Sequence, residues 1–188
     1  MLSLLAIAIL FFINRQVFTR GYGEFEINEA EIGIGNAKVK IKPNDQDLQI
    51  AYQLWVELST RKIGLPIDKD HDVIVEVYDS WYAFFKIARE LVQAIPVRKI
   101  RSNPSTKIII ELAFKILNEA LRLHLTQWQA RFRKWYEIEK AKDTNNTLTP
   151  QQLQKQFPDH KALENDMLRV NQILIAYKTL LEKLINIE

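Results

Sequence analysis

The spacing of apolar residues divides the chain into three parts. Residues 1–13 are almost wholly apolar, with Ser3 as the single polar side chain. Between residues 24 and 44, polar and apolar residues alternate with period 2, which is typical of half-buried strands. From Asn44 onward, apolar residues recur every three or four positions, as in amphipathic helices. The pattern predicts a mainly α protein, with an apolar N-terminal segment and a short β-ribbon before a helical part.

The helical part carries four long apolar stripes, which predicts a bundle of about four main helices. Asn44 or Asp45 is expected to cap the first helix, and Thr149 followed by Pro150 to open a short one. The expected helices cover about 44–62, 70–94, 105–142, 150–157 and 159 toward the C-terminus.

The apolar N-terminal run can be a membrane helix, a buried element or a secretory signal. A signal is disfavoured because no Lys or Arg precedes the run and no small-residue cleavage pattern follows it. As a helix, thirteen residues span about 20 Å and eighteen span about 27 Å, against about 30 Å for a bilayer core. We therefore predict a single-pass anchor at 1–18, a ribbon connector at 19–43 and a helical domain at 44–188.

The charged residues beside this anchor predict its orientation, and its own residues predict the character of a pore wall. Positive charge lies only on its C-terminal side, at Arg15 and Arg20, so the helical domain is expected in the cytoplasm. If several anchors assembled into a pore, its hydrophobic wall could gate by dewetting. A passive anchor is the alternative. The candidate pore or anchor positions are Ser3, Ile7, Leu10 and Asn14.

Charge is distributed unevenly although the formal net charge is only +3. Residues 21–97 contain 8 basic and 13 acidic side chains, whereas residues 98–140 contain 10 basic and 4 acidic ones. The basic excess thus falls on a predicted loop at 98–101 and on the third long helix.

This basic segment is a candidate phosphate-binding surface. At 100° per residue, His124, Gln127, Arg131 and Lys134 share a polar stripe beside aromatic residues, while Arg133 can pair with Glu137. Such a surface suits nucleic-acid phosphates. Alternatively, the aromatics belong to the core and the cations are solvated, or the basic loop contacts anionic lipid headgroups. The predicted phosphate ligands are Arg98, Lys99, Arg101, Arg131 and Lys134.

Catalytic and metal-binding patterns are weak in this sequence. The chain has no cysteine, and His71, His124 and His160 are isolated without a second histidine at i+4. No nucleophile elbow, Walker loop or dinucleotide loop is present. We therefore expect no enzyme activity, no cofactor and no metal.

Three stretches of the chain carry a resemblance to known proteins: EAEIGIGNAKVKIKPN at 29–44, WVELSTRKIGLPID at 55–68 and LNEALRLHLTQWQARFRKWYE at 117–137. They resemble a group of small bacterial proteins that join an N-terminal membrane helix to a helical cytosolic domain. The overall plan is also similar to the membrane effector of Hailong-type anti-phage systems, an oligomer controlled by single-stranded DNA oligomers. The resemblance implies a homo-oligomer, a single-stranded oligonucleotide ligand and a companion nucleotide-synthesising protein.

Together these observations predict a single-pass effector of anti-phage defence in the bacterial inner membrane. It would form pores or permeabilise the membrane when an anionic oligonucleotide binds the helical domain. The alternative is a membrane-tethered, non-enzymatic scaffold that docks a partner protein through its ribbon edge or its Trp-rich third helix.

Overall fold

A computed structural model describes residues 31–34, 37–40 and 43–185 of the chain. Short strands β1 (Glu31–Ile34) and β2 (Ala37–Lys40) pair antiparallel, with Ile32 opposite Val39. The helices that follow are α2 (Asp45–Thr60), α3 (Ile74–Gln93), α4 (Val97–Ser102), α5 (Pro104–Lys115), α6 (Arg122–His124), α7 (Ala130–Lys140), α8 (Pro150–Gln154) and α9 (His160–Ile185). Two π-helical segments, η1 (Ile116–Leu121) and η2 (Leu125–Gln129), and a short 3-10 turn, η3 (Asp143–Asn145), complete the described part.

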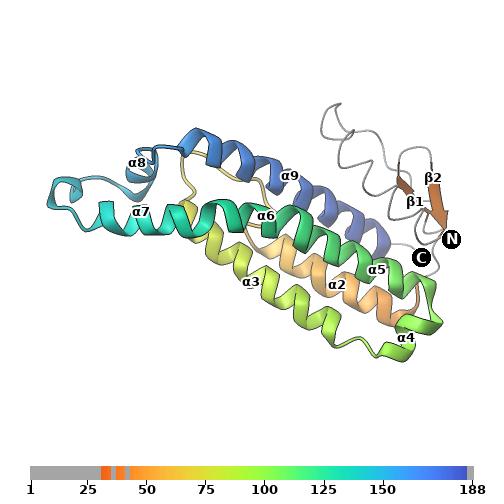
Figure 1. Ribbon diagram of the computed structural model, residues 1–188. Helices are drawn as coiled ribbons and strands as arrows, with labels where there is room; N and C mark the ends of the chain where they lie inside the picture. Colours follow the sequence, from red (N-terminus) through yellow and green to blue (C-terminus); the bar gives the residue numbers. More distant parts are fainter. Residues whose placement is uncertain (1–30, 35–36, 41–42, 186–188) are drawn as a thin grey trace.

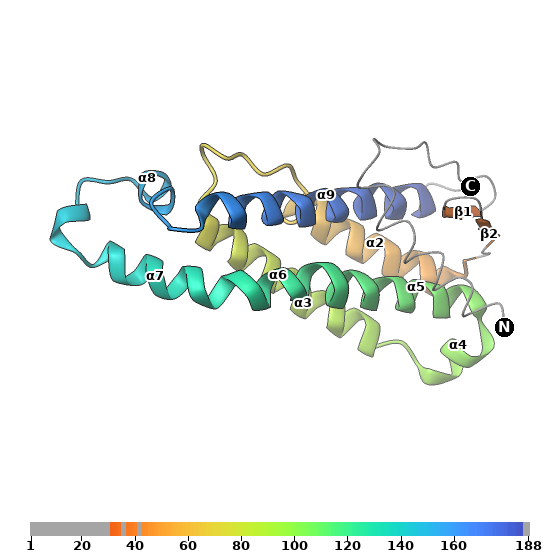
Figure 2. The same ribbon diagram turned by 45° about the horizontal axis from the view of Figure 1, so that its top comes forward.

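Four long rods run up and down beside one another, as Figures 1 and 2 show. The first is α2, the second α3, the third the continuous run from α5 to α7, and the fourth α9. The α4 end of the bundle holds the start of α2, helix α4 and the start of α5, whereas α7 and α8 lie at the opposite, α8 end. The prediction of a mainly α protein with a helical bundle is confirmed for the described residues.

One continuous core joins the four rods. The rods contribute apolar stripes at helical spacing, and α2 packs mainly against α9. The largest fully buried side chains include Trp81, Tyr78, Phe84 and Phe132. Each such side chain contributes about 1.5–3 kcal/mol through burial, so the aromatic residues of the predicted stripes mainly stabilise the bundle.

Polar side chains fix the helix starts where the sequence predicts them. Asn44 accepts hydrogen bonds from the backbone N–H groups of Gln46 and Asp47, at 3.0 and 3.1 Å. The buried carboxylate of Asp47 in turn accepts bonds from Ser105 Oγ at 2.7 Å and Thr106 Oγ1 at 2.6 Å. This cap therefore also ties the start of α2 to the start of α5.

The capping prediction for the short helix is also confirmed. Thr149 accepts a bond from the backbone N–H of Gln152, whose side chain accepts one from the Thr149 N–H, and Pro150 occupies the first helical position. The reciprocal bonds satisfy donors that a helix start leaves unpaired.

Three sequence interpretations of the helical part are wrong. Residues 98–101 belong to helix α4 and not to a loop. His124 is fully buried and not part of a polar stripe, and Arg133 pairs with Asp79 on α3 at 2.5 Å in place of Glu137. The physical cause of the last two errors lies in η1 and η2, because a π-helical turn holds about one residue more than an α-helical turn. Projection at 100° per residue therefore fails beyond residue 116.

The predicted anchor at 1–18, with the candidate positions Ser3, Ile7, Leu10 and Asn14, lies outside the described residues, as do residues 19–30, 35–36 and 41–42 of the 19–43 connector. Among the helices that the structure describes, none has the length and apolarity that crossing a bilayer requires.

Candidate functional site

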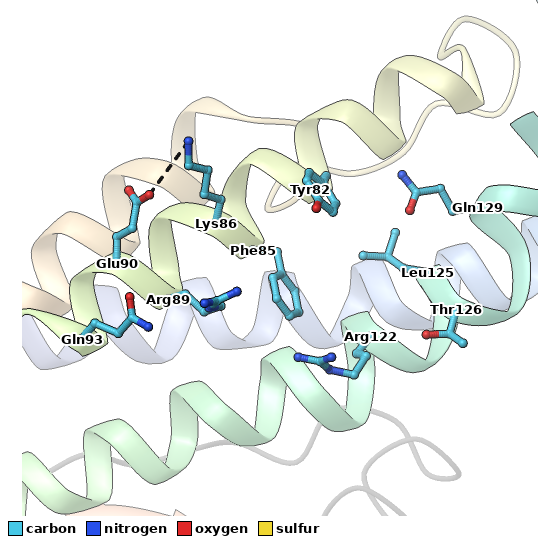
Figure 3. A pocket seen from close by; sticks show the side chains of 10 residues that line it. All are labelled: Tyr82, Phe85, Lys86, Arg89, Glu90, Gln93, Arg122, Leu125, Thr126 and Gln129. Carbon is cyan, nitrogen blue, oxygen red and sulfur yellow. Dashed lines mark ion pairs between the residues drawn. The ribbon is translucent and has the colours of Figure 1, made fainter.

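A groove opens between α3 and the α6–η2 part of the third rod. Its volume is about 550 Å³, within the range of about 300–1,000 Å³ that small-ligand sites occupy. Figure 3 shows Phe85 of α3 and Arg122 of the third rod approaching each other across it, with the Lys86 amino group directed toward Glu90. The lining residues are Tyr82, Phe85, Lys86, Arg89, Glu90, Gln93, Arg122, Leu125, Thr126 and Gln129.

The groove is cationic, because three basic side chains face one acidic side chain. Lys86 is 4.0 Å from Glu90, one helical turn away on α3. Arg89 forms no ion pair with any residue that the structure describes. Arg122 donates to Asn118 Oδ1 at 3.0 Å, an uncharged partner, so its positive charge is not neutralised.

Aromatic rings lie beside these cations. The Arg122 guanidinium stands 5.1 Å from the centre of the Phe85 ring, a cation–π distance that fixes its position across the groove. Tyr82 is 60% exposed and, with Leu125 and Gln129, occupies one end, whereas Arg89, Glu90 and Gln93 occupy the other (Figure 3). A groove of this kind can hold an anionic group against the cations and a flat ring against the aromatics.

A buried hydrogen-bond network stands behind the groove and joins three rods. His124 Nε2 lies 3.2 Å from the Tyr78 hydroxyl on α3, and His124 Nδ1 lies 2.7 Å from Asp166 Oδ2 on α9. Trp128 Nε1 donates to the same Asp166 oxygen at 3.1 Å. Arg169 donates to the other Asp166 oxygen at 3.0 and 2.8 Å, so the carboxylate is fully engaged.

The environment sets the charges in this network. Burial lowers the pKa of His124, and the opposing effect of Asp166 does not cancel it. Burial alone would raise the pKa of Asp166, but the hydrogen bonds from Arg169 and His124 together lower it. Burial also raises the pKa of the Tyr78 hydroxyl. A neutral His124 therefore donates from Nδ1 to the Asp166 carboxylate and accepts the Tyr78 proton at Nε2.

The order hydroxyl, imidazole, carboxylate in this network resembles that of a catalytic relay, but the hydroxyl and the imidazole are closed off from solvent. His124 and Tyr78 have no exposed surface, so a substrate cannot contact either group in this conformation. What the arrangement does is hold α3, α6 and α9 in one register.

The three-residue helix α6 connects the groove with this network. Arg122 and His124 are two residues apart, and such residues point to opposite sides of a helix. Arg122 accordingly lines the groove while His124 enters the core. π-helical segments flank α6 on both sides, a distortion that is frequent at functional sites.

The structure does not bring the predicted phosphate ligands together. Arg98, Lys99 and Arg101 are exposed on α4. Arg131 and Lys134 lie on α7, roughly 40 Å away along the third rod at 1.5 Å per residue. No single small ligand can contact both groups.

Arg131 is also not a free cation. It forms an ion pair with Asp159, the residue before α9, and its guanidinium lies near the rings of Trp128 and Phe157. Lys134 is exposed and makes no ion pair within the described part of the chain. The Trp-rich helix proposed as a docking surface is largely internal, because Trp128 is buried and Trp135 packs against Phe157.

Sequence reasoning missed Lys86 and Arg89, because both fall in a segment whose net charge is negative. It also placed His124 on a polar stripe and did not assign Arg122 to the candidate phosphate ligands. The available signal was the Phe85, Arg89 and Arg122 combination on two adjacent helices, but their pairing depends on the tertiary fold. Among the described residues, no group of three or more His, Asp or Glu side chains is placed to hold a metal.

Comparison with known proteins adds no constraint. No family model, curated protein or solved structure matches the chain.

Proposed function

We propose that this protein is a non-enzymatic, single-pass membrane effector of bacterial anti-phage defence whose helical domain binds an anionic oligonucleotide in the α3–α6 groove. The observation that carries the proposal is that Lys86, Arg89 and Arg122 line one groove beside Phe85 and the exposed Tyr82 ring. Phosphates bind guanidinium groups strongly because the planar donors match the phosphate oxygens.

The shape of the groove supports a short segment of ligand as the bound unit. Cations lie along its middle and at one end, and Tyr82, Leu125 and Gln129 lie at the other. A nucleotide has the same division, with phosphate at one end and a flat ring with hydrogen-bonding edges at the other. The Tyr82 ring provides a stacking surface, and the Gln129 amide can donate and accept hydrogen bonds.

Ligand binding would reach the core through α6. Helix α6 consists of three residues and contains both Arg122 and His124. A phosphate that draws Arg122 away from Phe85 would therefore also shift His124, which bonds to Tyr78 and Asp166. Because His124 and Trp128 both bond to Asp166 on α9, a shift of this segment would change how α9 packs. Self-association of the chain and permeabilisation by the 1–18 anchor would follow from that change.

Binding of fluorescent single-stranded DNA at several salt concentrations tests the ligand part. Replacing Arg89 and Arg122 with Glu should weaken binding at least tenfold and reduce the slope of log affinity against log salt by about two. The matched control replaces Arg131 and Lys134 with Glu and should change little. Loss of binding in the control alone would move the site to α7, and salt-independent binding would exclude phosphate recognition.

Expression in cells that carry a membrane-potential dye tests the effector part. The full chain should depolarise the membrane once ligand is present, and deletion of residues 1–18 should abolish this. An unchanged potential with the full chain and ligand, or unchanged toxicity after the deletion, would argue against a membrane effector.

A membrane-tethered scaffold is the second candidate, favoured by one surface feature. Tyr52 is 50% exposed on α2 and stacks on Trp55, with ring centres 6.1 Å apart. Aromatic pairs at a surface often mark protein contacts. A pull-down that captures one stoichiometric partner, is lost in a Tyr52→Ala variant and leaves membrane potential unchanged would favour this function.

A further inference from the structure

Helix α4 carries a cluster of cations that the groove does not use. Arg98, Lys99 and Arg101 are all exposed, and none forms an ion pair with any residue that the structure describes. The surrounding stretch, residues 97–110, contains four basic and no acidic residues. The cluster is therefore strongly positive and not neutralised by its own segment.

The geometry of α4 presents this charge outward. Ile100 packs against the core, so it fixes the inner side of the helix, while Val97 is 63% exposed next to the cations. The helix thus combines three free cations with one exposed apolar side chain, as helices that lie on membrane surfaces do.

Helix α4 lies at the end of the bundle where α2 begins. Bonds from Asn44 to Thr106 at 3.2 Å, and from Ser105 and Thr106 to Asp47, hold the start of α2 beside the start of α5 and hence beside α4. In the sequence, the predicted anchor at 1–18 and the connector at 19–43 precede α2. In Figures 1 and 2 the pair β1–β2, which precedes α2, also lies at this end.

We propose that the α4 end is the membrane-facing end of the bundle and that Arg98, Lys99 and Arg101 bind anionic lipid headgroups. This inference rests on the proposed membrane anchor. It gives the cations of α4 and the cations of the groove separate roles: those of α4 face lipid, and those of the groove, on the flank of the bundle, face the ligand. The cytoplasmic leaflet is negatively charged and attracts such clusters close to an anchor.

Site-specific labelling tests the orientation, because the chain contains no cysteine. Full-length Ser102→Cys carries a fluorophore on α4, and Thr144→Cys carries it at the α8 end as the matched control; both positions are exposed. Each is reconstituted into vesicles of phosphatidylcholine, alone or mixed with phosphatidylserine, that contain nitroxide-labelled headgroups. The α4 label should be quenched at least twofold more in the phosphatidylserine vesicles, and added salt should reverse the difference. The α8-end label should not respond.

Replacing Arg98, Lys99 and Arg101 with Gln in the Ser102→Cys chain should remove the dependence on phosphatidylserine, with helicity checked by circular dichroism. Equal quenching of both labels, or quenching of the α4 label that does not depend on phosphatidylserine, would overturn the inference and leave the anchor in place. Failure of the full chain to associate with either type of vesicle would instead reject the membrane effector itself, and the lipid contact with it.

Discussion

His124 makes two hydrogen bonds at the centre of the bundle: Nδ1 donates to Asp166, and Nε2 accepts the Tyr78 proton, which only the neutral ring can do. Burial lowers its pKa, so the folded protein keeps the ring neutral to lower pH than the unfolded chain does. In the unfolded chain the ring titrates near its ordinary pKa of about 6.5. Below that pH the unfolded state binds a proton that the folded state does not, so the free energy of unfolding should fall as pH decreases.

Replacing His124 with Gln should flatten this pH dependence and also lower stability at about pH 7.5 by about 1–3 kcal/mol, because buried partners lose their hydrogen bonds. Urea unfolding between about pH 7.5 and pH 5.5 measures both effects. Burial lowers the pKa of His160 as well, so adding His160→Gln should flatten the profile further. A variant that retains the wild-type pH dependence would show that His124 is not the responsible group.

Gly64 permits a close approach in the loop between α2 and α3. A Cβ atom at this position would lie 2.2 Å from the carbonyl oxygen of Leu58, a backbone atom that cannot move aside freely. Gly64→Ala should therefore cost about 1–3 kcal/mol of unfolding free energy, whereas Pro66→Ala, at an exposed position in the same loop, should cost less. Equal midpoints in urea for the two variants would contradict this steric account.

At the scale of elements, the third rod differs from the other three because it contains η1 and η2. These segments hold extra residues within an otherwise continuous helix and turn Arg122 and His124 toward different neighbours. The same segments explain why α7 presents Arg133 to Asp79 on α3. The rod therefore joins two helical registers, and α6 stands between them.

Deleting Gln127 from η2 should be tolerated better than deleting Gln172 from the regular helix α9, both residues being exposed. Loss of one residue can convert the π-helical turn to an α-helical turn. In α9 it instead rotates Leu174, Tyr177 and Leu181 out of the core by about 100°. Thermal unfolding should remain cooperative for the first deletion and become broad for the second. A broad transition for both would contradict the idea that η2 can lose one residue without disturbing the core.

At the scale of the whole molecule, the core described by the structure lies in the four rods and in the segments that connect them. Its buried apolar residues run from Ile50 to Leu184, and the polar contacts that tie helices and loops together begin at Asn44, so they also lie after residue 42. One such contact is that of Asn171 on α9, which donates to the carbonyl oxygens of Ile63 and Leu65 at 3.1 and 3.0 Å. The helical domain thus holds its own loops in place.

A chain that begins at residue 43 should therefore fold without the preceding residues. We expect helical circular dichroism and one cooperative thermal transition within about 5 °C of that of the full chain, a shift that corresponds to roughly 1–2 kcal/mol in a domain of this size. Loss of cooperativity in this shorter chain would show that residues 1–42 contribute to the core.

The sequence by itself determined the helical class, the approximate helix bounds, a cap at Asn44 or Asp45 and the cap at Thr149, because periodicity and capping are local properties of the chain. It also located the basic excess in residues 98–140. Only the tertiary structure decided that Asn44 is the first cap, that cations of this excess lie far apart on α4 and α7, and that Lys86 and Arg89 line the same groove as Arg122. The burial of His124 against Tyr78 and Asp166 was likewise decided there. These contacts join residues more than 30 positions apart, and two π-helical segments shift the register between them, so no single-helix projection could place them.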